Sequence, residues 1–131
     1  MAGLSPRRAD GTPDVSNIRK TMERFIEYGV RDRVIVHCPE AGFMLDAKGN
    51  FTAVGSIVLP EGYIKGSVGA GDAYSAACLY GLYYGWDDRE ILLFASGAAA
   101  FNLSAPDSIS GMRSKGEIMA LVKRMPVREV K

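Results

Sequence analysis

The segment Gly66–Tyr74 places two glycines and an aspartate at the start of a strongly helical stretch. Gly69 and Gly71 allow the backbone to approach a ligand closely and to adopt positive φ. A helix that begins at about Ala70 points its free N–H groups and the positive end of its dipole into the same turn, which creates a site for an anion. Asp72 adds a carboxylate in the first helical turn. A proton acceptor beside donors for phosphate oxygens is what phosphoryl transfer to an alcohol requires.

The same residues also have a purely structural explanation. A glycine-rich turn followed by an early aspartate is a common way to begin a helix, because the dipole stabilises the carboxylate. Two other phosphate-binding motifs are excluded. The segment has no Gly-Lys-Ser/Thr, which a P-loop requires, and Tyr74 stands where a dinucleotide fingerprint needs its third glycine. The pattern therefore leaves two hypotheses open, a phosphoryl-transfer site and an ordinary helix start.

Hydrophobic spacing and turn residues predict the elements that must position this segment. Asp14 or Ser16 is expected to cap the first helix, and Asp87 or Asp88 the third. Turn residues at 46–50 predict a hairpin between two strands. Helices are expected around residues 18–26, 72–84, 91–103 and 118–122, and strands at 34–36, 43–45, 51–54 and 56–59.

The second and third predicted helices differ in their apolar surfaces. The third is apolar almost all round, which predicts that it is buried between other elements. Strands and helices are mixed along the chain, which favours an α/β layered fold. In the second helix, one face is shared by Ala73, Ala76, Ala77, Tyr80 and Tyr84.

Composition narrows the class of protein. The chain has 131 residues, 47% of them hydrophobic, and a net charge of +1, so no strong field recruits nucleic acid or an anionic membrane. Met1–Thr12 lacks the apolar stretch of a signal peptide, and Ile91–Leu103 is too short to span a bilayer. The cytoplasm is the expected location. Cys38 and Cys78 form no CxxC pair and are expected to be buried thiols, and one histidine completes no zinc site with them.

The string Val68–Ala76 resembles the C-terminal signature of PfkB-type (ribokinase-like) carbohydrate kinases. The resemblance continues through Leu79–Leu82 and Phe94–Ala100 and reaches back to Val34–Phe43, so it covers most of the chain between Val34 and Pro106. It implies an α/β fold, namely the C-terminal part of a ribokinase-like doubly wound fold. It also implies ATP-dependent phosphorylation of a sugar or a sugar-like alcohol, with Mg²⁺ accompanying the ATP.

The resemblance assigns roles to the residues of the glycine-rich turn. Asp72 corresponds to the catalytic base that activates the acceptor hydroxyl. Gly69, Ala70 and Gly71 correspond to the anion hole, whose backbone amides surround the transferred phosphoryl group. Many members of the family also use a monovalent cation such as K⁺, which would be held here by carbonyls around Gly66–Val68 and the loop near Ala105–Ser108.

The adenine and ribose of ATP are expected beside the Gly42 turn and the stretch Ser96–Ala100, which contains Gly97. Other roles for these residues remain open: Ser96 and Gly97 permit close helix packing, and Gly42 is also a turn residue. His37 has no visible partner in the sequence, so we predict a structural role for it.

Several positions depart from the family pattern. Gly66-Ser67 stand where Asp-Thr is frequent, which affects the cation site more than the anion hole. Pro39 replaces a frequent glycine, and Ser96 stands where asparagine is common.

The resemblance implies that an N-terminal half, which holds most sugar-contacting residues, has no counterpart in these residues. We therefore expect a truncated gene product or a split gene. Residues 1–131 are predicted to form a single partial domain, with 1–13 as a loop or frayed N-terminus and 127–131 as a tail. The alternative function is a non-catalytic fragment or nucleotide-binding module, which would self-associate through exposed apolar edges or need its missing half. The acceptor stays open among ribose, fructose, a keto-deoxy sugar acid and a nucleoside.

Overall fold

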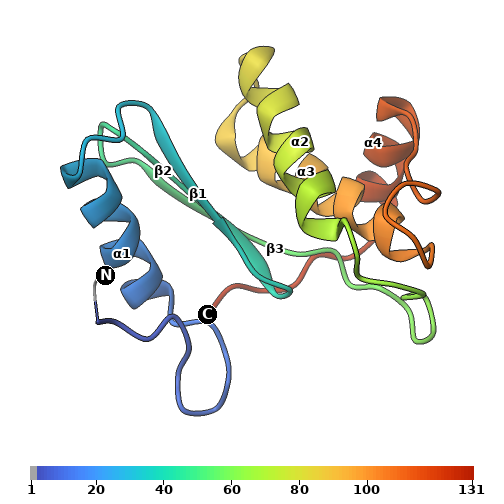
Figure 1. Ribbon diagram of the computed structural model, residues 1–131, viewed down its shortest axis with the longest axis horizontal. Coiled ribbons are helices and arrows are strands. Elements are labelled where there is room, and N and C mark those ends of the chain that lie inside the picture. Colours follow the sequence, from blue (N-terminus) through green and yellow to red (C-terminus); the bar gives the residue numbers. More distant parts are fainter. Residues whose placement is uncertain (1–2) are drawn as a thin grey trace.

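A three-stranded antiparallel sheet forms the centre of the molecule, and helices lie on both of its faces (Figure 1). The computed structural model describes residues 3–131, so residues 1 and 2 of the predicted N-terminal loop lie outside the described part. In chain order the elements are α1 (Val15–Glu27), β1 (Arg33–His37), β2 (Ala41–Asp46), β3 (Phe51–Gly55), α2 (Ala70–Tyr83), α3 (Asp88–Leu103) and α4 (Lys115–Arg124).

The predicted hairpin is confirmed between β2 and β3, which pair in antiparallel register. Asp46 organises its turn, since one carboxylate oxygen accepts hydrogen bonds from the N–H groups of Lys48 and Asn50, both at 2.9 Å. Gly49 adopts a φ of +90° in this turn, a conformation that glycine tolerates and other residues avoid. The strand order is β1-β2-β3, so β2 is the central strand.

Alternate side chains of β2 divide the core into two layers. Phe43 and Leu45 pack with Ile18 and Met22 of α1, whereas Met44 between them packs with the helices on the opposite face. Successive side chains of a strand point to opposite faces, so one strand can anchor both layers. Both faces of the sheet are therefore covered, as the predicted α/β class requires (Figure 1).

Three of the four helices begin at a side-chain cap. Asp14 accepts a hydrogen bond from the first turn of α1, Asp87 from that of α3, and Ser114 forms a capping box with Glu117 on α4. The predicted caps Asp14 and Asp87 are confirmed. Helix α2 is the exception, because it begins after Gly69 and no side chain caps it. Ala70 N–H makes a long hydrogen bond to the Ser67 carbonyl at 3.4 Å, and the N–H groups of Gly71 and Asp72 keep their capacity to bind a ligand.

The face of α2 that the spacing predicts is buried only in part. Ala73 and Ala77 are buried, but Ala76, Tyr80 and Tyr84 are exposed. The helix packs closely on α3 through its smallest side chains, and a Cβ added to Gly81 would lie 2.7 Å from Cγ1 of Ile91. Apolar residues occur all around α2, so their spacing alone did not identify the side that meets α3. The buried residues are Ala73, Tyr74, Ala77, Cys78 and Gly81.

The strand predicted at residues 56–59 is wrong, because only a single bridge between Ile57 and Val127 forms there. The C-terminal segment runs beside this stretch. Val58 donates a backbone hydrogen bond to Pro126 at 2.9 Å, and Arg128 donates one to Ser56 at 3.0 Å. The segment predicted as a tail thus packs against the end of β3. Contacts between segments so far apart in the chain leave no local pattern in the sequence.

A bidentate ion pair joins the N-terminal segment to the β1–β2 turn. Arg7 Nη1 and Nη2 donate to the two carboxylate oxygens of Glu40 at 3.0 and 3.1 Å. Mainly through this hydrogen bonding, Arg7 lowers the pKa of Glu40 from 4.5 to about 2. The backbone carbonyl of Glu40 also accepts from Ser56 N–H at 2.8 Å, so the turn is held from two sides.

Glu40→Gln is expected to remove part of the acid sensitivity of folding. The folded pKa of Glu40 lies below its unfolded value, so its contribution is complete above about pH 4.5 and is lost as the pH falls towards 2. Both side chains are more than a third exposed, so the effect is small and salt-sensitive. Urea midpoints at pH 6 and pH 3 should differ less in this variant than in the parent or in the exposed control Glu61→Gln. An equal pH response in all three proteins would contradict the assignment.

Candidate functional site

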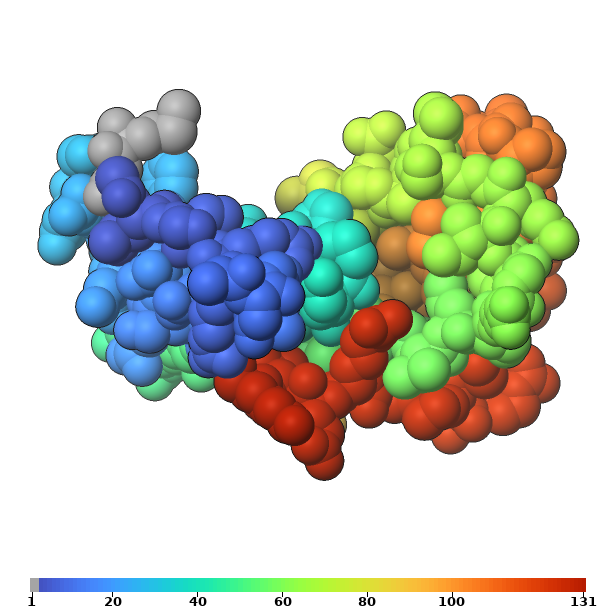
Figure 2. All heavy atoms as spheres, turned by 90° about the horizontal axis from the view of Figure 1, so that it is seen from below, coloured from blue at the N-terminus to red at the C-terminus, as the bar shows by residue number. Residues whose placement is uncertain are grey.

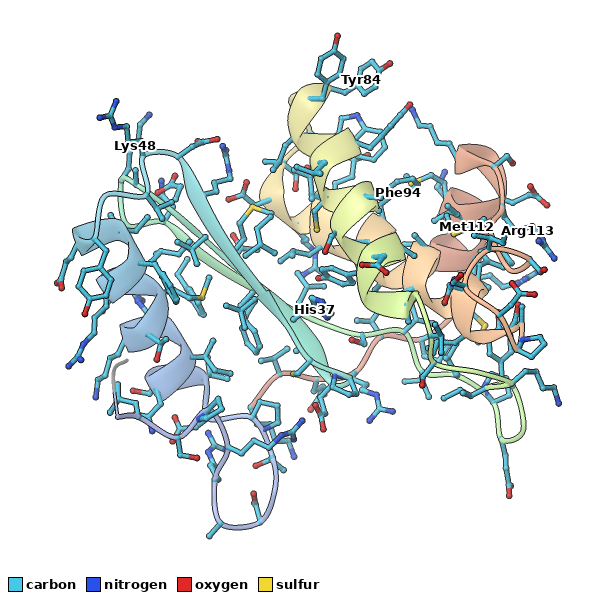
Figure 3. The ribbon with its side chains drawn as sticks, viewed as in Figure 1. His37, Lys48, Tyr84, Phe94, Met112 and Arg113 are labelled. Carbon is cyan, nitrogen blue, oxygen red and sulfur yellow. The ribbon has the colours of Figure 1, made fainter. Side chains whose placement is uncertain are left out.

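A cavity of about 420 Å³ opens between the β1–β2 turn, the N-terminus of α2 and one side of α3. His37, Cys38 and Pro39 form one wall, and residues 56–59 lie next to it. Figure 3 shows His37 between the sheet and α2. The lining is mostly apolar with a few polar groups, which is the usual character of a small-molecule site. Cys38 lines this cavity and is half-buried, so its predicted burial is wrong, whereas Cys78 is buried as predicted.

The N-terminus of α2 forms the polar end of the cavity. Gly69 is its N-cap residue with φ of +82°, and Ala70 and Gly71 both line the cavity. Ala73 N–H is the first to bond within the helix, to the Gly69 carbonyl at 2.8 Å. The amides of residues 70–72 precede it. Ala70 N–H makes a long hydrogen bond of 3.4 Å to the Ser67 carbonyl, whereas those of Gly71 and Asp72 have no intrahelical acceptor. Together with the helix dipole they favour an anion at this end of the cavity.

Close packing explains why residue 69 must be glycine. A Cβ at Gly69 would lie 2.7 Å from Cβ of Ser108, which belongs to the loop after α3, and the positive φ already disfavours other residues. A Cβ at Gly71 would meet only the ring of His37, 3.7 Å from Cε1. The missing side chain at Gly69 therefore lets the end of α2 pack against the loop after α3. The missing side chain at Gly71 leaves its backbone accessible from the cavity.

Asp72 lies in the first turn of α2 with its side chain exposed. It is not among the residues that line the cavity, and it points from the helix end towards solvent. A ligand that reaches the α2 amides through the cavity would end beside this carboxylate. A second ligand approaching from the solvent side could contact both.

Two of the four predicted nucleotide contacts line the cavity, Ser96 and Ala100 of α3. Ser96 Oγ accepts a hydrogen bond from Ile57 N–H at 3.0 Å, which satisfies a buried backbone donor and leaves the hydroxyl hydrogen for another acceptor. Gly97 lies elsewhere: a Cβ there would be 2.8 Å from Val122 and 2.9 Å from Ile118, on the side that packs on α4.

Gly42, the fourth predicted contact, lies in β2 beneath Tyr74 and outside the cavity lining. A Cβ at Gly42 would overlap the Tyr74 hydroxyl oxygen and lie 3.1 Å from Tyr74 Cζ. Among the described residues that hydroxyl has no hydrogen-bond partner, and burial raises its pKa. Gly42 therefore affects the cavity through Tyr74, whose ring lines it.

His37, for which the sequence predicted a structural role, has its ring in the cavity wall. Its ring stacks on that of Tyr74, with centroids 4.4 Å apart and planes inclined by 21°, and it lines the cavity next to Gly71. Burial lowers the pKa of His37, which favours the neutral ring near pH 7. The alternation of side chains along β1 could have predicted this position, because residues 35 and 37 point to the same face of the sheet, the one that meets α2.

Backbone carbonyls gather around Gly66. A Cβ there would lie 2.8 Å from the carbonyl oxygens of both Ala105 and Pro106. Next to them, Asn102 Nδ2 donates to the Ser108 carbonyl at 2.7 Å, and its fully buried Oδ1 has no partner among the described residues. Val68, whose carbonyl was also expected to hold the cation, is 67% exposed. Carbonyl and amide oxygens are the donors that a hard cation prefers, so the residues present fit such an ion.

Within residues 3–131, no group of three or more His, Cys, Asp or Glu side chains could hold a metal ion. In the same range, no helix has both the length and the apolar character needed to cross a membrane.

The contact between Gly42 and Tyr74 yields a double-mutant prediction. Gly42→Ala should destabilise the fold by roughly 1–3 kcal/mol, because its methyl group overlaps the tyrosine hydroxyl. Tyr74→Phe removes a buried hydroxyl without a partner, so alone it should be neutral or stabilising. Combined, the two changes should recover most of the loss in urea unfolding. Strictly additive effects would show that the two residues do not share this contact.

Comparison with known proteins identifies relatives of this arrangement. The sequence family described as pfkB family carbohydrate kinase matches residues 8–115. A 5-dehydro-2-deoxygluconokinase from Clostridium tetani is 33% identical over 112 residues, which cover 86% of this chain and 32% of that protein. The chain thus spans about a third of the length of the curated relatives that it matches.

Solved structures have the same fold. A ribokinase II of Escherichia coli in complex with ATP and Mg²⁺ superimposes with a TM-score of 0.71 at 23% identity, over 80% of this chain and 33% of that one. Phosphofructokinase-2 of Escherichia coli in complex with potassium gives a TM-score of 0.66 at 19% identity, over 91% and 35%. The predicted ribokinase-like fold is confirmed, and the match over residues 8–115 shows that the chain belongs to the pfkB family of carbohydrate kinases.

Proposed function

We propose that this chain forms the nucleotide-binding and catalytic part of an ATP-dependent kinase that phosphorylates a hydroxyl group of a sugar or sugar-like alcohol. One observation carries the proposal: the cavity ends at the uncapped N-terminus of α2, and Asp72 stands in the first turn of that helix. A site for phosphate oxygens and a proton acceptor are thereby adjacent. The family membership supports the same reaction class.

In this proposal the turn Gly69–Gly71 is the anion hole. Backbone amides of the first turn donate to the oxygens of the γ-phosphoryl group, and the dipole of α2 stabilises the charge on them. The donors are fixed before ATP arrives, because Gly69 is seated against Ser108. Catalysis of phosphoryl transfer depends mainly on such positioning and charge stabilisation.

Asp72 takes the role of general base. The acceptor hydroxyl approaches from the solvent side of α2, and its proton passes to the Asp72 carboxylate as the oxygen bonds to the γ-phosphorus. The bond between that phosphorus and the β–γ bridging oxygen breaks, and ADP leaves. A well-placed base of this kind contributes about 10²–10⁴-fold to the rate.

The body of the nucleotide occupies the cavity, between His37 on β1 and the α3 residues Ser96 and Ala100. Ser96 supplies a hydroxyl donor, and the apolar walls suit a purine ring. Gly42 and Gly97 do not contact the nucleotide. Because they lack a Cβ, Tyr74 can pack over Gly42 in the cavity wall, and α4 can pack closely on α3 at Gly97. Mg²⁺ enters with ATP and neutralises phosphate charge, and the E. coli ribokinase II structure with ATP and Mg²⁺ supports this pairing.

A monovalent cation such as K⁺ binds beside the anion hole. The carbonyls of Ala105 and Pro106, which approach Gly66, would hold it together with main-chain oxygens of residues 66–68. The E. coli phosphofructokinase-2 structure with potassium supports the choice of ion. A bound cation there would fix the loop that seats Gly69.

Among the acceptors left open by the sequence, a keto-deoxy sugar acid is favoured. The C. tetani relative is named for 5-dehydro-2-deoxygluconate, a compound of this class. ATP as the phosphoryl donor supports a cytoplasmic location. A second candidate function is a nucleotide-binding module without catalysis, and it is favoured by the cavity lining, which includes Ser96 and Ala100 but not Asp72.

Filling the cavity tests the nucleotide site directly. Ala99 lines the cavity and is only half-buried, so the ring introduced by Ala99→Phe should narrow the cavity, and unfolding of the variant is measured alongside because Ala99 also packs against the core. Calorimetric titration with MgATP in the presence of K⁺ should show saturable binding to the parent and roughly tenfold or greater loss of affinity in this variant. Ala120→Phe, at an exposed position of α4, is the matched control and should bind as the parent does. Equal affinity of the two variants would refute the site, and no binding to the folded parent would refute the function.

A further inference from the structure

Asn102, the last residue but one of α3, carries a buried oxygen that the protein itself leaves unpaired. Its side chain is fully buried, and Nδ2 donates to the carbonyl oxygen of Ser108 at 2.7 Å. Only the nitrogen of the amide can donate to a carbonyl, so this bond fixes which amide atom is which. Oδ1 has no hydrogen-bond partner among residues 3–131. A buried acceptor without a partner costs stability, which points to a ligand at Oδ1.

The hydrogen bond from Asn102 ends at the anion hole. A Cβ at Gly69, the N-cap residue of α2, would lie 3.0 Å from the carbonyl oxygen of Ser108, the same oxygen that accepts from Asn102. Figure 2 shows yellow-green atoms around the start of α2 beside orange atoms from the end of α3 and the loop after it. A displacement of Ser108 is therefore transmitted to Gly69 and to the amides of Gly71 and Asp72 that follow it.

The other oxygens near this loop are uncharged. The carbonyl oxygens of Ala105 and Pro106 would both lie 2.8 Å from a Cβ at Gly66, a position that brings no side chain of its own. Asp107 is the one carboxylate of the loop, and it is used within the loop, where it accepts from Ser110 N–H at 2.7 Å and from Ser110 Oγ at 2.6 Å. Neutral oxygens suit a monovalent cation, because carboxylates usually balance the charge of a divalent one.

We propose that Asn102 is a positioning residue that couples a monovalent cation to the anion hole. Oδ1 holds the cation together with the loop carbonyls, and Nδ2 connects it to Ser108. A cation on Oδ1 polarises the amide, which strengthens the hydrogen bond from Nδ2 to the Ser108 carbonyl. Ser108 then holds Gly69, and the first-turn amides of α2 keep their direction. This inference rests on the proposed function, and it adds a side-chain ligand to a site described so far by main-chain oxygens alone.

A buried water molecule is the rival ligand of Oδ1. Water would donate to Oδ1 in the same way in any salt, whereas a bound cation responds to the identity of the ion. The proposal therefore predicts different behaviour in KCl and in tetramethylammonium chloride at equal concentration, because the larger organic cation does not fit among the oxygens of one loop.

An NMR titration of the parent chain without nucleotide is the first test. KCl should shift the Nδ2 proton and nitrogen resonances of Asn102 saturably, together with the backbone amides of Gly69 and Gly71, and tetramethylammonium chloride should leave them in place. Asn17 is the internal control. Its Nδ2 also donates to a carbonyl, that of Ser5 at 3.1 Å, but it belongs to α1 on the opposite face of the sheet (Figure 1).

Two substitutions separate the roles of the two amide atoms. Asn102→Val removes both, so the rise in urea midpoint that KCl gives the parent should be lost, with the apparent K⁺ affinity reduced about tenfold or more. Its unfolding without K⁺ gives the structural cost of the change, so only the K⁺-dependent part is compared. Asn102→Asp keeps an oxygen for the cation and loses the donor to Ser108. K⁺ should therefore still stabilise this variant, but the shifts at Gly69 should disappear.

The coupling should also appear in nucleotide affinity. Because linkage is reciprocal, K⁺ should tighten the binding of MgATP to the parent by roughly fivefold or more, and this gain should be absent in Asn102→Val. Asn17→Val is the matched control, since it also removes an amide that donates to a backbone carbonyl, and it should retain the full response to K⁺.

The role of Asn102 would be overturned by equal K⁺ responses of the parent and Asn102→Val, or by Asn102 resonances that do not change with K⁺. Equal responses to KCl and tetramethylammonium chloride would assign Oδ1 to water. A parent that binds MgATP without any response to K⁺ would refute the cation and the role of Asn102, and the nucleotide site would stand. A parent in which K⁺ shifts Asn102 but MgATP does not bind would refute the proposed function and leave the role of Asn102 intact.

Discussion

The close packing of the N-terminal end of α2 against its neighbours is the constraint on which the rest of the structure depends. One end of the helix is held where Gly69 meets Ser108, and its first turn is anchored where Tyr74 packs over Gly42. Neither contact tolerates an added methyl group. Together they fix the direction of the first-turn amides and the position of Asp72 relative to the cavity. The absence of a side-chain cap on α2, in contrast to the other three helices of residues 3–131, leaves the amides of Gly71 and Asp72 available to a ligand.

Much of the fold followed from local patterns. The capping residues Asp14 and Asp87 and the turn around Asp46 act within a few residues of themselves, so the sequence predicted them correctly. The bridge at Ile57 and the buried face of α2 depend on segments far away in the chain. Spacing in one segment does not show which partner will cover it. The strand predicted at residues 56–59 was therefore wrong, and the face predicted for α2 is buried only in part.

In the candidate site, too, features set by neighbouring residues were predicted, and features set by distant segments were not. The string around Gly71 and Asp72 has local chemistry, so it was predicted from the sequence, and the structure brings Ala70, Gly71, Ser96 and Ala100 to one cavity. Gly97 had been assigned to the nucleotide, but it faces α4. His37 reaches the cavity only because β1 passes beneath α2 and Tyr74 stacks on its ring. That neighbourhood exists only in three dimensions.

The central claim is that the α2 N-terminus and the adjoining side of α3 bind the nucleotide, and an amide-resolved NMR titration with MgATP tests it most directly. The account predicts saturable shifts that are largest at residues 70–72 and 96–100, with α1 unaffected. Shifts confined to α1 and the outer edge of β1, or none in a folded protein, would contradict it.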